Sequence, residues 1–221
     1  LLYLPGLIGL FLLKSPSNPE KSETETKAKP INVWLVILMV VLFFIYVGVE
    51  MGFGGWIYTY AIEVKIMNES NAAYINSLYW GALTIGRLLT VFISRKLPPS
   101  KILIGNFSLA ILALTVILIW PLTSTAIWIG SAGLGFALSS IFPTLLVLGE
   151  TRMRITGGIT GLFFLGSSIG GMVVPMVLGQ IIEFVGSYEI MATLLGLVLV
   201  GFVVLISVIA ASNRAGEKTR T

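Results

Sequence analysis

Six long apolar segments alternate with short polar stretches along most of the chain. They occupy residues 32–62, 72–95, 102–120, 126–148, 155–182 and 188–211. A helix needs about 20 predominantly apolar residues to cross a hydrocarbon core about 30 Å thick. Segments of this length satisfy their backbone groups in lipid as helices, whereas the strands of a membrane barrel are shorter and alternate strictly. The pattern therefore predicts an all-α, polytopic membrane protein with six transmembrane helices.

The two ends of the chain differ from this block. The apolar run 1–13 is too short to span, and we interpret it as the end of a truncated transmembrane helix, since no initiator Met precedes it. Residues 14–31 are polar, carry mixed charge and contain three prolines, so we expect a cytoplasmic linker there. The six-helix bundle is placed at 32–212 and a cytoplasmic tail at 213–221. The sequence is thus expected to be a fragment of a larger protein.

The six segments are of two kinds. The third and sixth are almost entirely apolar, whereas the first, second, fourth and fifth contain Gly, Ser, Thr, Asn or charged residues. Apolar helices suit a position facing lipid, and polar ones suit a bundle interior or a water-filled cavity. Two groups of three helices, each ending in an apolar member, indicate a three-plus-three inverted repeat. We expect the four polar helices to share one concave face and the two apolar ones to be the most exposed to lipid.

Composition narrows the possible functions. Charged residues make up 11% of the chain, compared with about 25% in soluble domains. The sequence contains no Cys, His or Asp, which excludes disulfides, thiolate metal sites, Ser-His-Asp and Cys-His catalysis, and most zinc sites. We therefore expect no catalytic residues, no bound metal and no other cofactor. The basic residues lie in short loops beside apolar helices, which indicates a lipid bilayer rather than a nucleic acid as partner.

The distribution of Lys and Arg predicts the orientation. With the linker in the cytoplasm, the basic residues on that side are Lys14, Lys21, Lys27, Lys29, Arg95, Lys96, Lys101, Arg152, Arg154, Arg214, Lys218 and Arg220. The outer loops then contain only Lys65, and Arg87 lies within a helix. This bias follows the positive-inside rule in every loop. Both ends of the six-helix block are therefore expected in the cytoplasm, with the protein in the plasma membrane.

Glu50 is the only acidic residue deep within a predicted span. It lies between Tyr46 and Trp56 among four glycines, which should weaken the first helix and expose backbone groups. A carboxylate at this depth costs a few kcal/mol on insertion scales, so a reason for its presence is needed. Three roles are open: it accepts hydrogen bonds from a polar solute, it takes and releases a coupling proton, or it forms a structural ion pair.

The fourth helix contains a second irregular stretch. Three glycines precede Ser139-Ser140-Ile141-Phe142-Pro143, and Pro143 removes one helical hydrogen bond. Interrupted helices at matching places in two repeats are a sequence indication of a transport site. The alternative is close helix packing through small residues, which membrane bundles also use.

Polar and aromatic side chains of the second helix recur at spacings of three and four. Asn76, Tyr79, Trp80 and Arg87 are therefore expected on one face. An amide and two aromatic rings suit a sugar, which has hydroxyls at its edges and C–H groups on its faces. The alternative is anchoring at the membrane–water interface, where Tyr and Trp are enriched.

Charged residues near the cytoplasmic boundary predict a gate or brace. Arg87 lies roughly two turns inside that boundary, and Glu150 ends the fourth helix on the same side. We expect Arg87 to pair with Glu150 in an inner-face charge network that includes Arg95. Arg152 and Arg154 are competing partners for Glu150.

Three motifs in order resemble a known family. YVGVEMGFGGWIYTYA at 46–61 is similar to the seventh helix of the fucose permease-like branch of the major facilitator superfamily. AAYINSLYWGALTIGRLLTVFISRKL at 72–97 resembles its eighth helix, and GFALSSIFPTLLVLGE at 135–150 resembles its tenth. The resemblance covers nearly the whole chain. Within the branch it is nearest to the group of sodium-dependent glucose transporters and major facilitator domain-containing 4 proteins.

The resemblance implies the C-terminal six-helix half of a twelve-helix secondary transporter that works by alternating access. It implies a sugar such as glucose or fucose as substrate, with Na⁺ or H⁺ as coupling cation. Glu50 occupies the part of helix seven where sugar carriers place polar substrate contacts. The candidate substrate-binding residues are Glu50, Tyr46, Trp56, Asn76, Tyr79, Trp80 and Phe142. One departure is that Ser94 stands before Arg95-Lys96, where the loop signature of the superfamily usually has Asp.

Two other functions fit the same sequence. A carrier of this fold can move a different small solute, because fold does not fix substrate. A membrane scaffold without transport activity is the alternative from another class.

Overall fold

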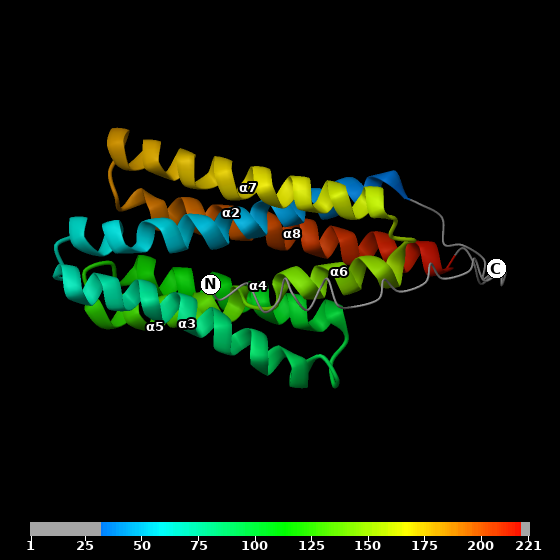
Figure 1. The fold of residues 1–221 in the computed structure, drawn as a ribbon, viewed down its shortest axis with the longest axis horizontal. Helices are drawn as coiled ribbons and strands as arrows, with labels where there is room; N and C mark the ends of the chain where they lie inside the picture. The colour runs from blue at the N-terminus through cyan, green and yellow to red at the C-terminus, as the bar shows by residue number, and fades with distance from the viewer. Residues whose placement is uncertain (1–31, 218–221) are drawn as a thin grey trace, which may run out of the picture.

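A computed structural model describes residues 32–217, with side chains described as far as residue 211. The segments predicted at 1–13 and 14–31 lie outside the described residues, as does the end of the tail. The described part consists of helices joined by short turns, without strands, and the helices run side by side along the long axis (Figure 1). They are α2 (Val33–Glu63), α3 (Glu69–Ile93), α4 (Pro99–Ile119), α5 (Ser124–Leu138), α6 (Ile141–Arg152), α7 (Gly157–Phe184) and α8 (Glu189–Glu217).

Local chemistry fixes where several of these helices begin. The Asn32 side chain accepts from the amides of Trp34 and Leu35, and the Asn68 side chain caps α3 in the same way. Such N-caps bond amides that have no partner in the first turn of a helix. The start of α4 has Pro99 at its first position, which needs no N–H and has a φ already suited to a helix. At the C-terminal end, α8 continues to Glu217, beyond the end at 211 that was predicted for the sixth segment.

Five stretches of described helix are long and apolar enough to cross a membrane. They are α2, α4, the combined α5–α6 stretch, α7 and α8. The predicted six-helix fold is confirmed, although α3 is less apolar than these five stretches. Its 25 residues include Arg87, two Asn and several hydroxyl residues, although it packs within the same bundle. A helix this polar needs neighbours or water along part of its surface.

The packing of the helices follows the expected inverted repeat. The most extensive contact joins α2 to α7, and α3 packs against α5. In a three-plus-three repeat, α2 corresponds to α5–α6, α3 to α7 and α4 to α8. The α2–α7 contact then corresponds to the α5–α3 contact, and the α2–α8 contact corresponds to the α5–α4 contact. All four contacts are present. The connectivity is therefore that of two equivalent three-helix groups.

The glycines of α2 do not interrupt it. The helix is continuous from Val33 to Glu63, so the expectation that it would be weakened was wrong. A Cβ on Gly48 would come within 2.5 Å of Val174, and a Cβ on Gly170 of α7 would overlap the carbonyl of Phe44. The missing side chains allow the two backbones to approach closely, which is the small-residue packing considered as the alternative.

The fourth predicted helix is interrupted, as expected. It divides into α5 and α6 at Ser139–Ser140, the first two residues of the Ser-Ser-Ile-Phe-Pro sequence. Pro143 has no N–H to donate to the carbonyl of Ser139. The Ser139 hydroxyl and amide both donate to the carbonyl of Phe136, and Asn106 of α4 donates to the Ser140 hydroxyl oxygen. The break is thus held by side chains rather than by a continuous helical ladder.

Exposure differs from expectation for two helices. Only six of the 25 residues of α3 are buried, and among the five long apolar spans α8 is the least buried but the next is α7 rather than α4. Only one side of α7 is covered, chiefly by α2. Its other side exposes Leu165, Ile169, Met172 and Met176. The polar residues of α7 predict an interior position. They do not reveal that part of the α7 surface is uncovered in this chain.

Candidate functional site

A cavity of about 540 Å³ lies between α2, α3, α6 and α7. Its lining residues are Tyr46, Val47, Glu50, Met51, Arg87, Phe142, Pro143, Ser167, Ser168 and Gly171. These positions belong to the first, second, fourth and fifth predicted helices, and none of them belongs to α4 or α8. The prediction that the four polar helices share one concave face is confirmed. We call this space the central cavity.

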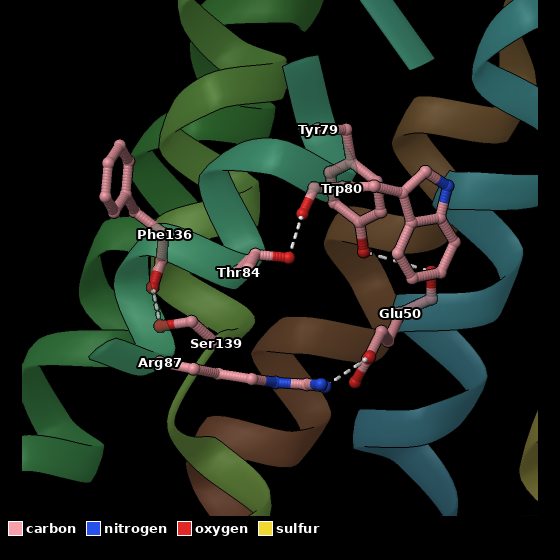
Figure 2. Close-up of polar contacts among 7 residues, drawn as sticks. All are labelled: Glu50, Tyr79, Trp80, Thr84, Arg87, Phe136 and Ser139. Atoms are coloured by element: carbon pink, nitrogen blue, oxygen red, sulfur yellow. Dashed lines mark hydrogen bonds and ion pairs between the residues drawn. The ribbon is translucent and has the colours of Figure 1, made fainter. Parts of the chain in front are cut away.

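A charge pair occupies one wall of the central cavity. Arg87 Nη2 of α3 donates to Glu50 Oε1 of α2 across 3.2 Å (Figure 2). The Glu50 side chain is only 6% exposed, whereas that of Arg87 is 55% exposed. The carboxylate therefore needs the guanidinium to offset the free-energy cost of burying its charge. The guanidinium depends less on the carboxylate, because water can reach it.

This pair corrects the expected partner of Arg87. Glu150 lies near the end of α6 and Arg95 lies in the turn after α3, but the carboxylate that Arg87 contacts is Glu50. A buried carboxylate has a stronger need for a counter-charge than an exposed one at the bundle end, where water screens it. The role of Glu150 and Arg95 in an inner-face network stays a prediction.

The hydroxyl of Tyr46 is fully buried and makes no hydrogen bond of normal geometry with the described residues, but Glu50 and Arg87 lie close enough to interact with it. Tyr46 precedes Glu50 by one helical turn, so both side chains lie on the same face of α2. Buried polar atoms are nearly always hydrogen-bonded, and an exception requires an explanation. The neighbouring Glu50–Arg87 pair supplies that explanation, because the hydroxyl belongs to the same buried polar cluster.

Tyr79 lies behind the cavity wall. It is fully buried, and its hydroxyl donates to the backbone carbonyl of Glu50 across 3.0 Å (Figure 2). Its ring packs against Phe53 and Trp80, with centroid separations of 4.9 Å and 5.1 Å. These contacts hold α3 against α2 at the level of Glu50. Tyr79 therefore positions the segment that carries Glu50 and is not itself a lining residue of the central cavity.

Three more of the candidate binding residues lie elsewhere. Trp56 packs on Gly179 and its Nε1 donates to the carbonyl of Pro175 across 2.9 Å, so it joins α2 to α7. Trp80 is partly exposed and covers Gly54 of α2. Asn76 is half-buried, and its Oδ1 has no partner among the described groups. None of the three is a lining residue of the central cavity.

Helical geometry explains why the expected face of α3 is divided. At about 100° per residue, positions 76, 79, 80, 83, 84 and 87 extend over an arc of about 140°. The side of α3 that packs against the bundle is narrower than this arc, so these positions cannot all lie on it. Tyr79 and Leu83 face the bundle, whereas Trp80, Thr84 and Arg87 are exposed. Spacing alone did not show where the boundary between the two surfaces falls.

No residue of α7 was among the predicted binding residues, yet Ser167, Ser168 and Gly171 line the central cavity. The hydroxyl of Ser167 donates to the carbonyl of Phe163 across 2.9 Å. A Ser-Ser pair followed by two glycines in an otherwise apolar span was the available signal. It was weaker than a charge or an aromatic ring, because hydroxyls in membrane helices commonly bond to their own backbone.

Comparison with known proteins gives the family. The profile of the Major Facilitator Superfamily matches residues 1–175. The chain belongs to the major facilitator superfamily. Members of this superfamily are multi-pass membrane transporters.

Among curated relatives in the superfamily, human Major facilitator superfamily domain-containing protein 4A is 32% identical over 143 residues, which are 64% of this chain and 28% of that protein. Human Sodium-dependent glucose transporter 1 is 29% identical over 171 residues, 76% of this chain and 33% of that protein. Sodium-dependent glucose transporter 1A of Mus musculus is 27% identical over 175 residues, 78% of this chain and 41% of that protein. The matched region thus spans about a third of the length of these relatives.

Proposed function

We propose that this chain is the C-terminal six-helix half of a secondary carrier that moves a sugar across the plasma membrane by alternating access. In carriers of this kind the binding site lies between two halves, near the middle of the bilayer. A second half would close the open side of the central cavity. The coupling cation is proposed to be Na⁺ or H⁺, and both ends of the six-helix block are proposed to be cytoplasmic. The names of the two glucose transporter relatives support a sugar as substrate.

One observation carries this proposal: a cavity of about 540 Å³ is lined by Tyr46 together with the Glu50–Arg87 pair. A sugar hydroxyl both donates and accepts, so it can bond to a phenol, a carboxylate or a guanidinium. The guanidinium has five N–H groups and the bond to Glu50 uses one of them, which leaves donors for a solute. Phe142 contributes an aromatic ring that suits the C–H face of a sugar.

The proposal is tested by removing only the Tyr46 hydroxyl. The complete carrier would be reconstituted in liposomes, and uptake of labelled glucose and fucose measured with an inward Na⁺ gradient, an inward H⁺ gradient or neither. We expect Tyr46→Phe to raise KM by roughly 2–12-fold, the equivalent of one net hydrogen bond of about 0.5–1.5 kcal/mol. Tyr60→Phe is the control, since it removes a hydroxyl from a buried tyrosine of the same helix, about 21 Å away.

Two results would each contradict one part of the proposal. Absence of saturable sugar uptake by a well-folded carrier would exclude a sugar substrate, and the same liposomes then serve to screen other small solutes. Equal KM values for Tyr46→Phe and the unmodified carrier would remove Tyr46 from the site while leaving the sugar assignment in place.

A further inference from the structure

A second cavity lies outside the central cavity, between α3 and α4 with the end of α5 as its floor. It has a volume of about 370 Å³. Large apolar side chains form its walls, including Leu89 and Ile93 of α3 and Leu109 of α4, and Phe136 of α5 closes part of the floor. These four residues are exposed or partly exposed in this chain. We call this cavity the α3–α4 groove.

The polar groups of the groove already have partners within the protein. The hydroxyl of Thr90 donates to the carbonyl of Gly86, and that of Ser139 donates to the carbonyl of Phe136. The Asn106 amide donates to the hydroxyl oxygen of Ser140 across 2.6 Å. These donors therefore need no solute. The groove is therefore suited to an apolar occupant.

Positive charge is concentrated at one end of the groove. Lys101 lines the groove itself, and Arg95 and Lys96 lie in the exposed turn between α3 and α4. Lys101 is in the first turn of α4, where the helix dipole disfavours a cation. Its position is thus not explained by the stability of α4. Three basic groups beside an apolar groove complement a ligand with an anionic head and an apolar chain.

The dimensions agree with a lipid. From Lys101 to Leu109 the groove follows α4 for about 12 Å, close to half of a hydrocarbon core about 30 Å thick. We propose that the α3–α4 groove binds an anionic phospholipid of the cytoplasmic leaflet. Its phosphate lies beside Lys101, Arg95 and Lys96, and one acyl chain lies along Leu89, Ile93 and Leu109. Anionic lipids are abundant in that leaflet, which these residues face in the proposed orientation.

Photolabelling of the complete carrier in phosphatidylcholine nanodiscs tests this site. The probes are phosphatidylserine and phosphatidylcholine that carry the same diazirine in the middle of one acyl chain. We expect phosphatidylserine to label peptides of α3 and α4 at least about fivefold more strongly than phosphatidylcholine, the effect of about one basic group at an anionic head. Lys101→Gln should reduce this preference, whereas Arg154→Gln, another exposed basic residue of the proposed cytoplasmic side, should not.

A matched pair of glycine substitutions tests the acyl-chain part. Gly105 lines the groove, and a Cβ placed there meets nothing within 4 Å, so Gly105→Leu fills the groove without a clash. Gly196 of α8 is equally open, and Gly196→Leu is the control. We expect Gly105→Leu to reduce groove labelling at least fivefold and Gly196→Leu to leave it unchanged, with labelling of α8 peptides as the internal reference for Gly105→Leu.

Equal labelling by the two lipids would overturn the head-group assignment, and unchanged labelling in a folded Gly105→Leu protein would show ordinary annular lipid only. If Gly105→Leu does not fold, the comparison of Lys101→Gln with Arg154→Gln decides between the site and non-specific attraction of the basic loops.

Discussion

The pair of Glu50 and Arg87 leads to an asymmetric prediction. Arg87→Gln leaves a carboxylate that is 6% exposed without its counter-charge. Glu50→Gln leaves a guanidinium that is 55% exposed and can be hydrated from the cavity. Gln also keeps the volume of Glu and an oxygen that can accept from Arg87. We therefore expect Arg87→Gln to destabilise the carrier more than Glu50→Gln does.

The size of the difference follows from the burial of the two partners. Breaking a fully buried ion pair costs about 3–5 kcal/mol. The half-exposed arginine reduces this value, and we expect about 2–3 kcal/mol for Arg87→Gln. Glu50→Gln replaces a charged hydrogen bond by a neutral one and should cost about 0.5–1.5 kcal/mol. The double variant has no unpaired charge, so it should be more stable than Arg87→Gln alone, with a coupling of about 1–2 kcal/mol.

Thermal unfolding and transport together measure these effects. The expected order of Tm is unmodified carrier, then Glu50→Gln, with Arg87→Gln lowest and the double variant above it. Concentrative sugar uptake by Glu50→Gln, measured beside surface biotinylation, should fall strongly at nearly normal expression. If Glu50 also transfers a coupling proton, exchange without net flux should survive in this variant while concentrative uptake fails.

Three results would refute this reasoning. Equal Tm values for the two single variants would show that the carboxylate does not depend on Arg87. Additive effects in the double variant would show that the two groups do not interact. Full concentrative transport by a well-expressed Glu50→Gln protein would remove Glu50 from the site.

Two further predictions concern the packing around the site. Tyr79→Phe removes the bond to the Glu50 carbonyl and should lower stability by about 1 kcal/mol with KM unchanged within about twofold, whereas a tenfold change in KM would make Tyr79 a substrate contact. Gly170→Val should abolish the monodisperse peak in size-exclusion chromatography, because its Cβ would overlap the Phe44 carbonyl. Gly161→Val, in open space on the same helix, should retain that peak, and loss of both peaks would implicate valine itself.

The positions of the helices follow from the sequence more closely than their contacts. The first segment was predicted at 32–62 and the structure has α2 at Val33–Glu63, because apolar length is a local property. The contrast between Gly48 and Pro143 shows which helix disturbances can be predicted from the sequence alone. Both were expected to disturb a helix, but a glycine does so only if no neighbour fills its space, whereas a proline lacks its N–H in every environment.

The candidate site could be predicted only in part for a similar reason. Tyr46, Glu50 and Phe142 line the central cavity, and their role in binding stays a prediction. The approach of Arg87 to Glu50 depends on how α2 and α3 cross, and no spacing within either helix contains that information. The same is true of Tyr79, whose hydroxyl could point to the cavity or to a backbone carbonyl with the same sequence pattern.

The break between α5 and α6 has a mechanical consequence. A single 29-residue rod would transmit a tilt at one end to the other, about 40 Å away. Here Ser139 bonds back to Phe136, and the Thr144 amide bonds to Ser140, so each side of the break closes its own turn. The rod α5 is held by α3 and α4, whereas α6 touches α4 and α2. The fourth span therefore consists of two rods joined at Ser139–Ser140, and a tilt of α6 beside the central cavity need not be transmitted to α5.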